Sequence, residues 1–174
     1  LLAAPELPLA ADAERYQPGE LIGAGGMGRV VVAHDRRLGR EVALKEVPAD
    51  ADPGLRARLL HEAAIAARLD HPGIVPVHDV GQRADGSVFI AMRVIRGRSL
   101  AELIARPEHA PGMLYRSVLA AAEAVGWAHA MSVVHRDLKP ANIMVGEFGE
   151  TQVVDWGLAH VVGEPMSTPA VGTP

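Results

Sequence analysis

The sequence contains no cysteine, so it can form neither disulfide bonds nor thiolate metal sites. It also lacks any apolar run near the roughly 20 residues of a membrane-spanning helix, and we expect no membrane segment in this chain. Charge of one sign is not in large excess, because the formal net charge at pH 7 is −4. This balance gives no indication of a nucleic-acid partner, and we expect none.

What the chain does have is the composition of a folded protein. Of its 174 residues, 49% are hydrophobic and 22% are charged, which is typical of a globular protein with one substantial core. Residues 1–15 are mostly alanine, proline and leucine without a clear period, and we interpret them as a leader or linker. A strand-like pattern begins at Tyr16.

Four glycines lie close together in the segment 23–28, between Leu21-Ile22 and the valine run that begins at Val30. A GxGxxG pattern alone is weak evidence for a phosphate-binding hairpin, because the same pattern is more common in dinucleotide-binding proteins, where its glycines open a helix. Here β-branched residues follow, and they favour a strand. The pattern therefore predicts a hairpin whose bare backbone can fold over phosphates. A flexible glycine-rich turn is the alternative.

The next predicted strand, residues 40–47, carries a lysine in an unusual place. Alternation puts Val42, Leu44 and Glu46 on one face and the small apolar neighbours of Lys45 on the other. An ammonium group seeks water, so Lys45 either extends outward along its stem or pairs with an acid or a phosphate.

A helix is predicted over about residues 55–69, with Leu59, Ala63 and Leu69 on one apolar stripe. Glu62 lies beside this stripe rather than opposite it. It could turn inward toward a buried cation, although such a glutamate is more often solvated.

The remaining elements follow at short intervals. Their order, a β-rich first half with one helix and then a mainly helical half, predicts an α+β chain in two lobes. The pattern predicts strands over 74–80 and 87–95, helices from Ser99 and over about 112–130, strands over 133–134 and 143–145, and a last strand over 151–154.

A polar loop, residues 135–142, separates two of these apolar strands. Its Asp137, Lys139 and Asn142 supply a carboxylate, an ammonium and an amide within six residues. Such a set could accept a hydroxyl proton, neutralise a phosphate and ligate a hard metal ion. Taken alone, an ordinary ion-paired surface loop is an equal alternative.

Five motifs in this order resemble the eukaryotic-type (Hanks-type) protein kinase family, over about residues 16–174. The glycine-rich core resembles that of bacterial Ser/Thr kinases. The resemblance implies an α+β, bilobal protein-kinase-like fold: a β-rich N-lobe with one αC-type helix (16–92), a hinge (93–97) and a partial, mainly helical C-lobe (98–174) that ends in the activation segment. The motifs are Gly23-x-Gly25-x-x-Gly28-x-Val30, Val42-Ala43-Leu44-Lys45, Glu62 in a helix, His135-Arg136-Asp137-Leu138-Lys139-Pro140-Ala141-Asn142, and Asp155-Trp156-Gly157.

The resemblance implies ATP and Mg²⁺ as cofactors. Asp137 would accept the substrate hydroxyl proton, Lys139 would neutralise the γ-phosphate, and Asn142 and Asp155 would ligate the metal. The implied ATP contacts are Ile22, Gly23, Ala24, Gly25, Gly26 and Gly28 in the loop, Val30, Ala43 and Met144 around adenine, Met92 as gatekeeper, Arg93 and Ile95 at the hinge, and Lys45 with Glu62, besides Asp155.

The same resemblance implies a substrate class. Lys139, two residues after Asp137, is typical of Ser/Thr kinases, and Arg136 argues against kinases of small molecules. We therefore expect transfer of the ATP γ-phosphate to Ser or Thr hydroxyls of protein substrates. Ser167 and Thr168 are expected autophosphorylation sites. The alternative is a catalytically incompetent kinase-like module that binds nucleotide or partners.

Two departures from the family pattern qualify these expectations. Trp156 stands where phenylalanine is usual, and its indole N–H needs a partner. The family continues beyond the point where this chain stops. We therefore expect a truncated piece of a longer product, marginal or inactive alone, in which Trp127, Val133, Val134 and Trp156 lose packing partners. A cytoplasmic location is expected. Related bacterial kinases often carry a membrane anchor, and a missing C-terminal part could contain one.

Overall fold

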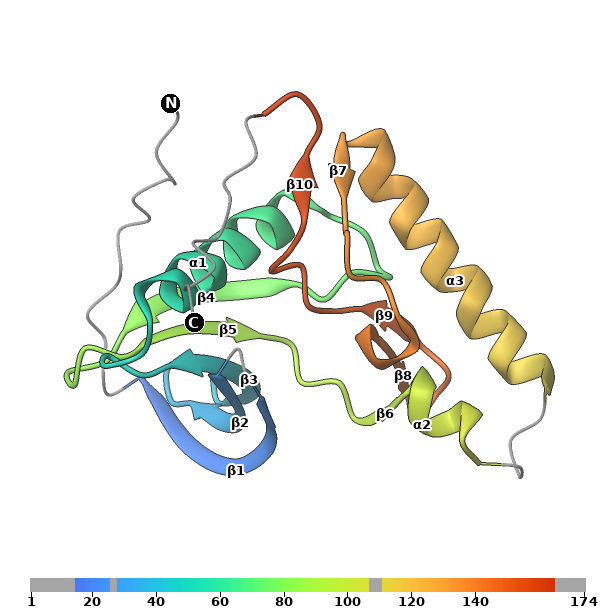
Figure 1. Cartoon of the computed structure of the whole chain (residues 1–174). Helices are drawn as coiled ribbons and strands as arrows, with labels where there is room; N and C mark the ends of the chain where they lie inside the picture. The colour runs from blue at the N-terminus through green and yellow to red at the C-terminus, as the bar shows by residue number, and fades with distance from the viewer. Residues whose placement is uncertain (1–14, 26–27, 107–110, 165–174) are drawn as a thin grey trace. The chain divides into compact units, whose positions relative to one another are not determined.

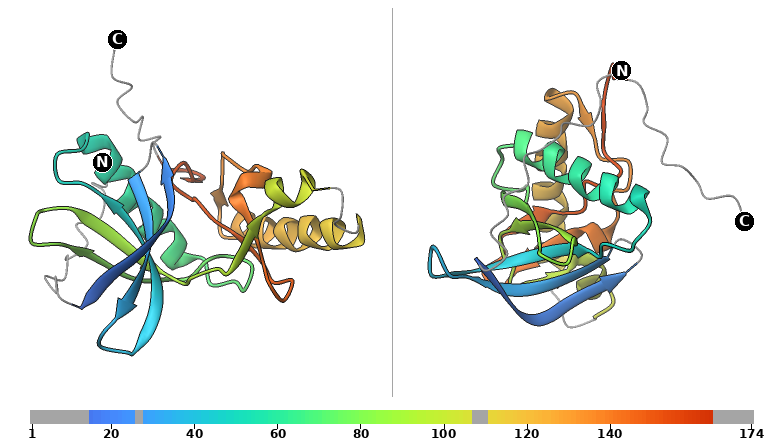
Figure 2. Two further views of the ribbon diagram at one scale, coloured as in Figure 1. Left: turned by 90° about the horizontal axis from the view of Figure 1, so that it is seen from below. Right: turned by 90° about the vertical axis from the view of Figure 1, so that its left-hand side faces the viewer.

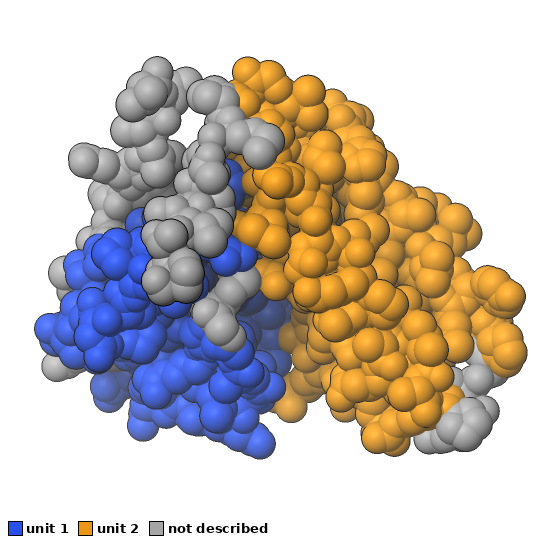
Figure 3. All heavy atoms as spheres, viewed as in Figure 1, with its two compact units in different colours: residues 1–64, 76–94, 165–174 blue, residues 65–75, 95–164 orange. Residues whose placement is uncertain are grey.

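The computed structural model describes residues 15–25, 28–106 and 111–164 (Figure 1). Contacts divide these residues into two compact units. Unit 1 comprises residues 15–64 and 76–94, and unit 2 comprises residues 65–75 and 95–164 (Figure 3). The α+β class expected from the sequence is confirmed, because unit 1 is a sheet with one helix and the longest helix lies in unit 2.

Unit 1 is built on an antiparallel five-stranded sheet in the order β1-β2-β3-β5-β4. The predicted glycine-rich hairpin and the predicted strand 40–47 are confirmed. The predicted strand 74–80 begins later than expected, at Val77. Pro76 has no N–H to continue a strand ladder, and Ile74 forms a single bridge to Val153 in unit 2. The strands are β1 (Tyr16–Gly25), β2 (Gly28–Asp35), β3 (Arg40–Val47), β4 (Val77–Gln82) and β5 (Val88–Met92).

The alternation predicted for β3 gives the sheet its two faces. Val42 and Leu44 pack on one face in a cluster with Tyr16 and Phe89. The other face is covered by helix α1 (Pro53–Arg68), which lies along the sheet in Figure 2. There Leu59 and Ala63 of the predicted apolar stripe pack against Val47, Val88 and Ile90.

Unit 2 combines two helices with short strands. The predicted capping box is confirmed: the Ser99 hydroxyl accepts a hydrogen bond from the Glu102 backbone N–H, and the Glu102 carboxylate accepts one from the Ser99 N–H. The elements are β6 (Gly97–Ser99), α2 (Leu100–Ile104), α3 (Pro111–Ala130), β7 (Val133–Val134), a 3₁₀ turn η1 (Pro140–Asn142), β8 (Ile143–Gly146), β9 (Thr151–Val153) and β10 (His160–Val161).

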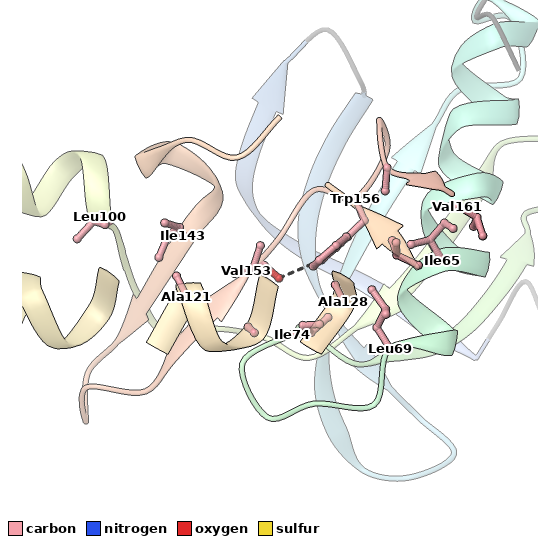
Figure 4. Packing of buried hydrophobic residues seen from close by; sticks show 13 residues of the cluster. Ile65, Leu69, Ile74, Leu100, Ala121, Ala128, Ile143, Val153, Trp156 and Val161 are labelled. Carbon is pink, nitrogen blue, oxygen red and sulfur yellow. Dashed lines mark hydrogen bonds between the residues drawn. The ribbon is translucent and has the colours of Figure 1, made fainter. Parts of the chain in front are cut away.

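One apolar cluster forms the core of unit 2 (Figure 4). Its α3 residues, Ala121, Ala124 and Ala128, lie three and four positions apart on one helix face, where small side chains allow close approach to the strands. The end of α1 adds Ile65 and Leu69 to the same cluster. These side chains surround Trp156, the largest fully buried side chain among the described residues.

The expectation that four apolar residues lack packing partners is wrong for two of them. Val133 and Trp156 are each 1% exposed, because the end of α1 and the β7–β10 ladder pack around them. Trp127 and Val134 are 42% and 37% exposed, as expected. No helix among the described residues is long and apolar enough to cross a membrane.

Gly28 is a position where only glycine fits. Its φ is +105°, and a Cβ there would collide with the carbonyl oxygen of Glu46. We expect Gly28→Ala to lower the free energy of unfolding by about 1–3 kcal/mol, measured by chemical denaturation.

Gly25 provides the matched control. An added Cβ would meet no atom within 4 Å there, so Gly25→Ala should change the free energy of unfolding by no more than about 0.5 kcal/mol. Equal effects of the two substitutions would contradict the assigned geometry.

Candidate functional site

Within unit 1, Lys45 and Glu62 form a buried ion pair. The Lys45 Nζ donates to Glu62 Oε2 at 2.6 Å, and the two residues are 8% and 6% exposed. Strand alternation turns Lys45 toward α1, and Glu62 faces inward beside the apolar stripe of that helix. The structure thus selects the paired alternative for Lys45 over the solvated one. A buried ion pair fixes both side chains, because neither charge can be left without a partner at low cost.

The glycine-rich hairpin lies in the same sheet. Gly25 pairs with Gly28 across the turn, and Val30 pairs with Lys45 on β3. Two glycines therefore end the paired parts of β1 and β2, and β2 lies next to the strand that carries the lysine. The other expected nucleotide contacts of unit 1 lie on three strands. Ile22 and Ala24 are exposed on β1 and Gly23 is half-buried there, while Ala43 is buried on β3. Met92 is the last residue of β5, Arg93 follows it, and Gly26 lies outside the described residues.

Within unit 2, the polar loop is a hydrogen-bonded cluster around Asp137. The Lys139 Nζ donates to Asp137 Oδ2 at 2.7 Å. The Asn142 amide donates to the Asp137 backbone oxygen at 2.9 Å and to its Oδ2 at 3.2 Å. The hydrogen bond from Lys139, with help from Asn142, lowers the pKa of Asp137. Asp137 is therefore an ionised hydrogen-bond acceptor at neutral pH.

His135 connects this loop to the segment that follows β9. Its Nδ1 accepts a hydrogen bond from the Asp137 backbone N–H at 3.3 Å. The ring proton then resides on Nε2, which donates to the Val154 carbonyl oxygen at 3.1 Å. Burial lowers the pKa of His135, so the neutral ring that these bonds require is the stable form.

The same segment carries Asp155 in a left-handed conformation with φ +65°. Contacts on both sides hold it there. The Val154 N–H donates to the Asn142 carbonyl at 3.0 Å. The Trp156 indole N–H donates to the Val153 carbonyl at 3.3 Å, the bond drawn in Figure 4. The indole thus obtains the partner it needs, and the ring packs against His135 at 4.5 Å between centroids. Asn142 and Asp155 are brought together by backbone pairing.

Asn142 and Asp155 suit a hard divalent cation. The two hydrogen bonds from the Asn142 side chain to Asp137 use its amide nitrogen, so its side-chain oxygen is the atom that could ligate a metal. Among the described residues, no group of three or more His, Asp or Glu side chains could hold a metal alone. An amide oxygen and a single carboxylate fit Mg²⁺, which is commonly held by one or two carboxylates together with substrate phosphates.

The remaining expected residues have simple placements. Ile95 lies between the last residue of unit 1 and β6, and half-buried Met144 lies in β8 between Ser99 and Gln152. Ser167 and Thr168 lie outside the described residues.

Sequence reasoning gave no role to His135, and it did not find the left-handed conformations of Arg136 (φ +67°) and Asp155. A histidine between an apolar strand and a polar loop is a weak indication of a buried hydrogen-bonding residue. Its partner, Val154, lies 19 residues further along the chain and is identified only by the fold.

Together these features define a class: an α+β protein with a glycine-rich hairpin, a buried Lys–Glu pair and an ordered Asp, Lys and Asn loop. The family model for the protein kinase domain matches residues 16–174, and the chain belongs to this family.

Bacterial relatives agree with this assignment. The chain is 39% identical over 160 residues to a probable serine/threonine-protein kinase of Streptomyces coelicolor, covering 88% of this chain and 24% of that protein. It is 42% identical over 160 residues to the serine/threonine-protein kinase PknD of Chlamydia muridarum, covering 84% and 17%. It is 36% identical over 177 residues to the probable serine/threonine-protein kinase PknB of Bifidobacterium longum, covering 93% and 25%. The chain spans a quarter or less of these relatives.

Removing one member of the buried ion pair should destabilise the fold. Glu62→Gln removes the charge of the carboxylate that the buried Lys45 ammonium bonds, and we expect the free energy of unfolding to fall by about 3 kcal/mol. The double substitution Lys45→Met with Glu62→Leu replaces the pair by apolar side chains and should recover most of that loss, as measured by chemical denaturation.

The exposed Glu20 of β1 serves as the control for the same chemical change. Glu20→Gln should leave the unfolding midpoint in place. If the double variant is less stable than Glu62→Gln, the buried charge is not the cause of the loss.

His135 should make stability depend on pH. Its folded-state pKa lies below the ordinary value of 6.5, so the unfolded chain binds a proton that the folded chain excludes. Its contribution to the unfolding free energy is complete above about pH 6.5 and declines as the pH falls below it, by at most about 1.4 kcal/mol per pH unit. His135→Asn should flatten the dependence of the unfolding free energy on pH below about 6.5. The measurement is chemical denaturation at a series of pH values between 7.5 and 5, in steps of about 0.5 pH unit.

His129 is exposed in the last turn of α3 and provides the comparison. His129→Asn should leave the wild-type slope intact, and an unchanged slope in His135→Asn would contradict the role of the buried ring.

Proposed function

We propose that the protein is an ATP-dependent protein kinase that transfers the γ-phosphate to Ser or Thr hydroxyls. The observation that carries this proposal is the cluster around Asp137. Lys139 and Asn142 bond to its carboxylate, and Asn142 is paired through its backbone with the segment that bears Asp155. This arrangement supports the proposal, because it holds a carboxylate, an ammonium and two further side-chain oxygens in one hydrogen-bonded region of unit 2.

Each residue has a defined part in this proposal. Asp137, ionised at neutral pH, orients the substrate hydroxyl and accepts its proton. Lys139 neutralises charge on the phosphoryl group during transfer, so its ammonium group must contact the phosphoryl oxygens as well as the Asp137 carboxylate. Asn142 and Asp155 would hold Mg²⁺, which supplies positive charge to the phosphate oxygens when it is bound.

Unit 1 has the task of binding nucleotide. Lys45, held by Glu62, would contact the α- and β-phosphates, and the backbone N–H groups of the hairpin at Gly25 and Gly28 would cover them. Val30 and Ala43 would contact adenine. We propose the boundaries 16–92, 93–97 and 98–174 for the N-lobe, hinge and C-lobe.

Substrate class rests on Lys139 and on the relatives, which are named serine/threonine-protein kinases. We propose that the protein phosphorylates Ser and Thr residues of proteins in the cytoplasm.

The decisive experiment follows labelled phosphate from ATP to a generic Ser/Thr protein substrate in the presence of Mg²⁺. Asp137→Asn removes the proton acceptor with little change of shape, and we expect the transfer rate to fall about 10²–10⁴-fold.

Asp50→Asn makes the same chemical change at an exposed turn before α1 and should transfer phosphate at the wild-type rate. Wild-type rates in Asp137→Asn would overturn the proposed role. Nucleotide binding without transfer in the unmodified protein would instead identify a nucleotide-binding module.

A further inference from the structure

A buried carboxylate in unit 1 has no part in the proposed reaction. Glu46 follows Lys45 on β3, points to the opposite face of the sheet and is 2% exposed. Burying a carboxylate is costly unless it is paired and hydrogen-bonded. We therefore consider which side chains pair with the Glu46 carboxylate.

Its first partner is a fixed arginine. Arg83, in the turn between β4 and β5, donates from Nε to Glu46 Oε1 at 2.7 Å, with its Nη2 2.6 Å from the same oxygen. The Arg83 Nη1 also donates to the Tyr16 carbonyl at 3.4 Å, and its guanidinium lies 5.6 Å from the Phe89 ring centroid. Contacts to β1, β3 and β5 thus immobilise Arg83.

Its second partner is Arg29, the residue directly after the last glycine of the hairpin. The Arg29 Nε donates to the other oxygen, Glu46 Oε2, at 3.0 Å. Unlike Arg83, the Arg29 side chain is 60% exposed. Glu46 also contacts the hairpin through its backbone, because its carbonyl lies against the Cα of Gly28. One strand residue therefore holds two consecutive residues at the return of the hairpin.

We propose that Arg29 is a positioning residue for the glycine-rich hairpin, and that Glu46 and Arg83 form its anchor. Glycine backbone is conformationally free, and its amides bind phosphate well only when their directions are fixed beforehand. The ion pair fixes the return strand from the face opposite Lys45, so Arg29 itself touches no phosphate. This inference rests on the proposed function and deepens it.

Arg29→Gln tests the inference, because an exposed arginine can be changed without unfolding the sheet. We expect the KM for ATP to rise about threefold to fivefold, the range that loss of one partly exposed ion pair allows, with kcat unchanged. Arg29→Lys keeps the charge and most of the reach, and should restore at least half of the lost affinity. Arg36→Gln, at an exposed site beyond β2, should behave as wild type.

Hydrogen exchange without nucleotide gives a second readout that does not depend on activity. In Arg29→Gln, peptides spanning the hairpin should exchange faster, while peptides from α3 should not change. An unchanged KM or unchanged exchange in the hairpin would overturn the inference, as would a loss of kcat alone. If the unmodified protein transfers no phosphate, the proposed function fails, and the exchange rates alone decide the role of Arg29.

Discussion

A hydrogen bond from the buried ring of His135 to the Val154 carbonyl joins the two segments of unit 2 that carry the side chains proposed to act in phosphoryl transfer. One segment holds Asp137, Lys139 and Asn142, and the other holds Asp155. A second ring bond, in which His135 Nδ1 accepts from the Asp137 backbone N–H, requires a neutral imidazole, and burial against Trp156 stabilises that form. The site therefore depends on a core residue that touches neither the metal nor the substrate in the proposed reaction.

In unit 1, buried polar groups are also stabilised by specific partners, here by opposite charges. The strand β3 places buried charged side chains on both faces of the sheet, and each of these charges has a partner of opposite sign. Lys45 pairs with Glu62 on the helix side, and Glu46 pairs with Arg29 and Arg83 on the other. Because an unpaired charge would destabilise the unit, these pairings are fixed before any nucleotide binds. Preorganisation of this kind is what phosphoryl transfer requires of a protein.

Much of this arrangement was predictable from sequence because it follows local periodicity. Alternation in β3 sets Lys45 beside small apolar residues, and helical spacing in α1 sets Glu62 beside the apolar stripe, so that their pairing was one of two alternatives. The motifs indicate the protein kinase family. Other features depend on contacts between distant segments. The partners of His135 and Glu46, the left-handed backbone of Asp155 and the short strands β6 and β10 have no local pattern. The burial of Trp156 was missed because its partners come from the end of α1 and from the β7–β10 ladder.

In the proposed reaction, Asn142 and Asp155 act together as a cation site completed by nucleotide phosphates. Titration with Mn²⁺, followed by its electron paramagnetic resonance signal in the presence of a non-hydrolysable ATP analogue, tests it most directly. Nucleotide-dependent Mn²⁺ binding should be present in the unmodified protein and in Glu147→Ala, a change on an exposed turn, and lost in Asp155→Ala and weakened in Asn142→Leu. Equal Mn²⁺ binding in all four proteins would contradict the account.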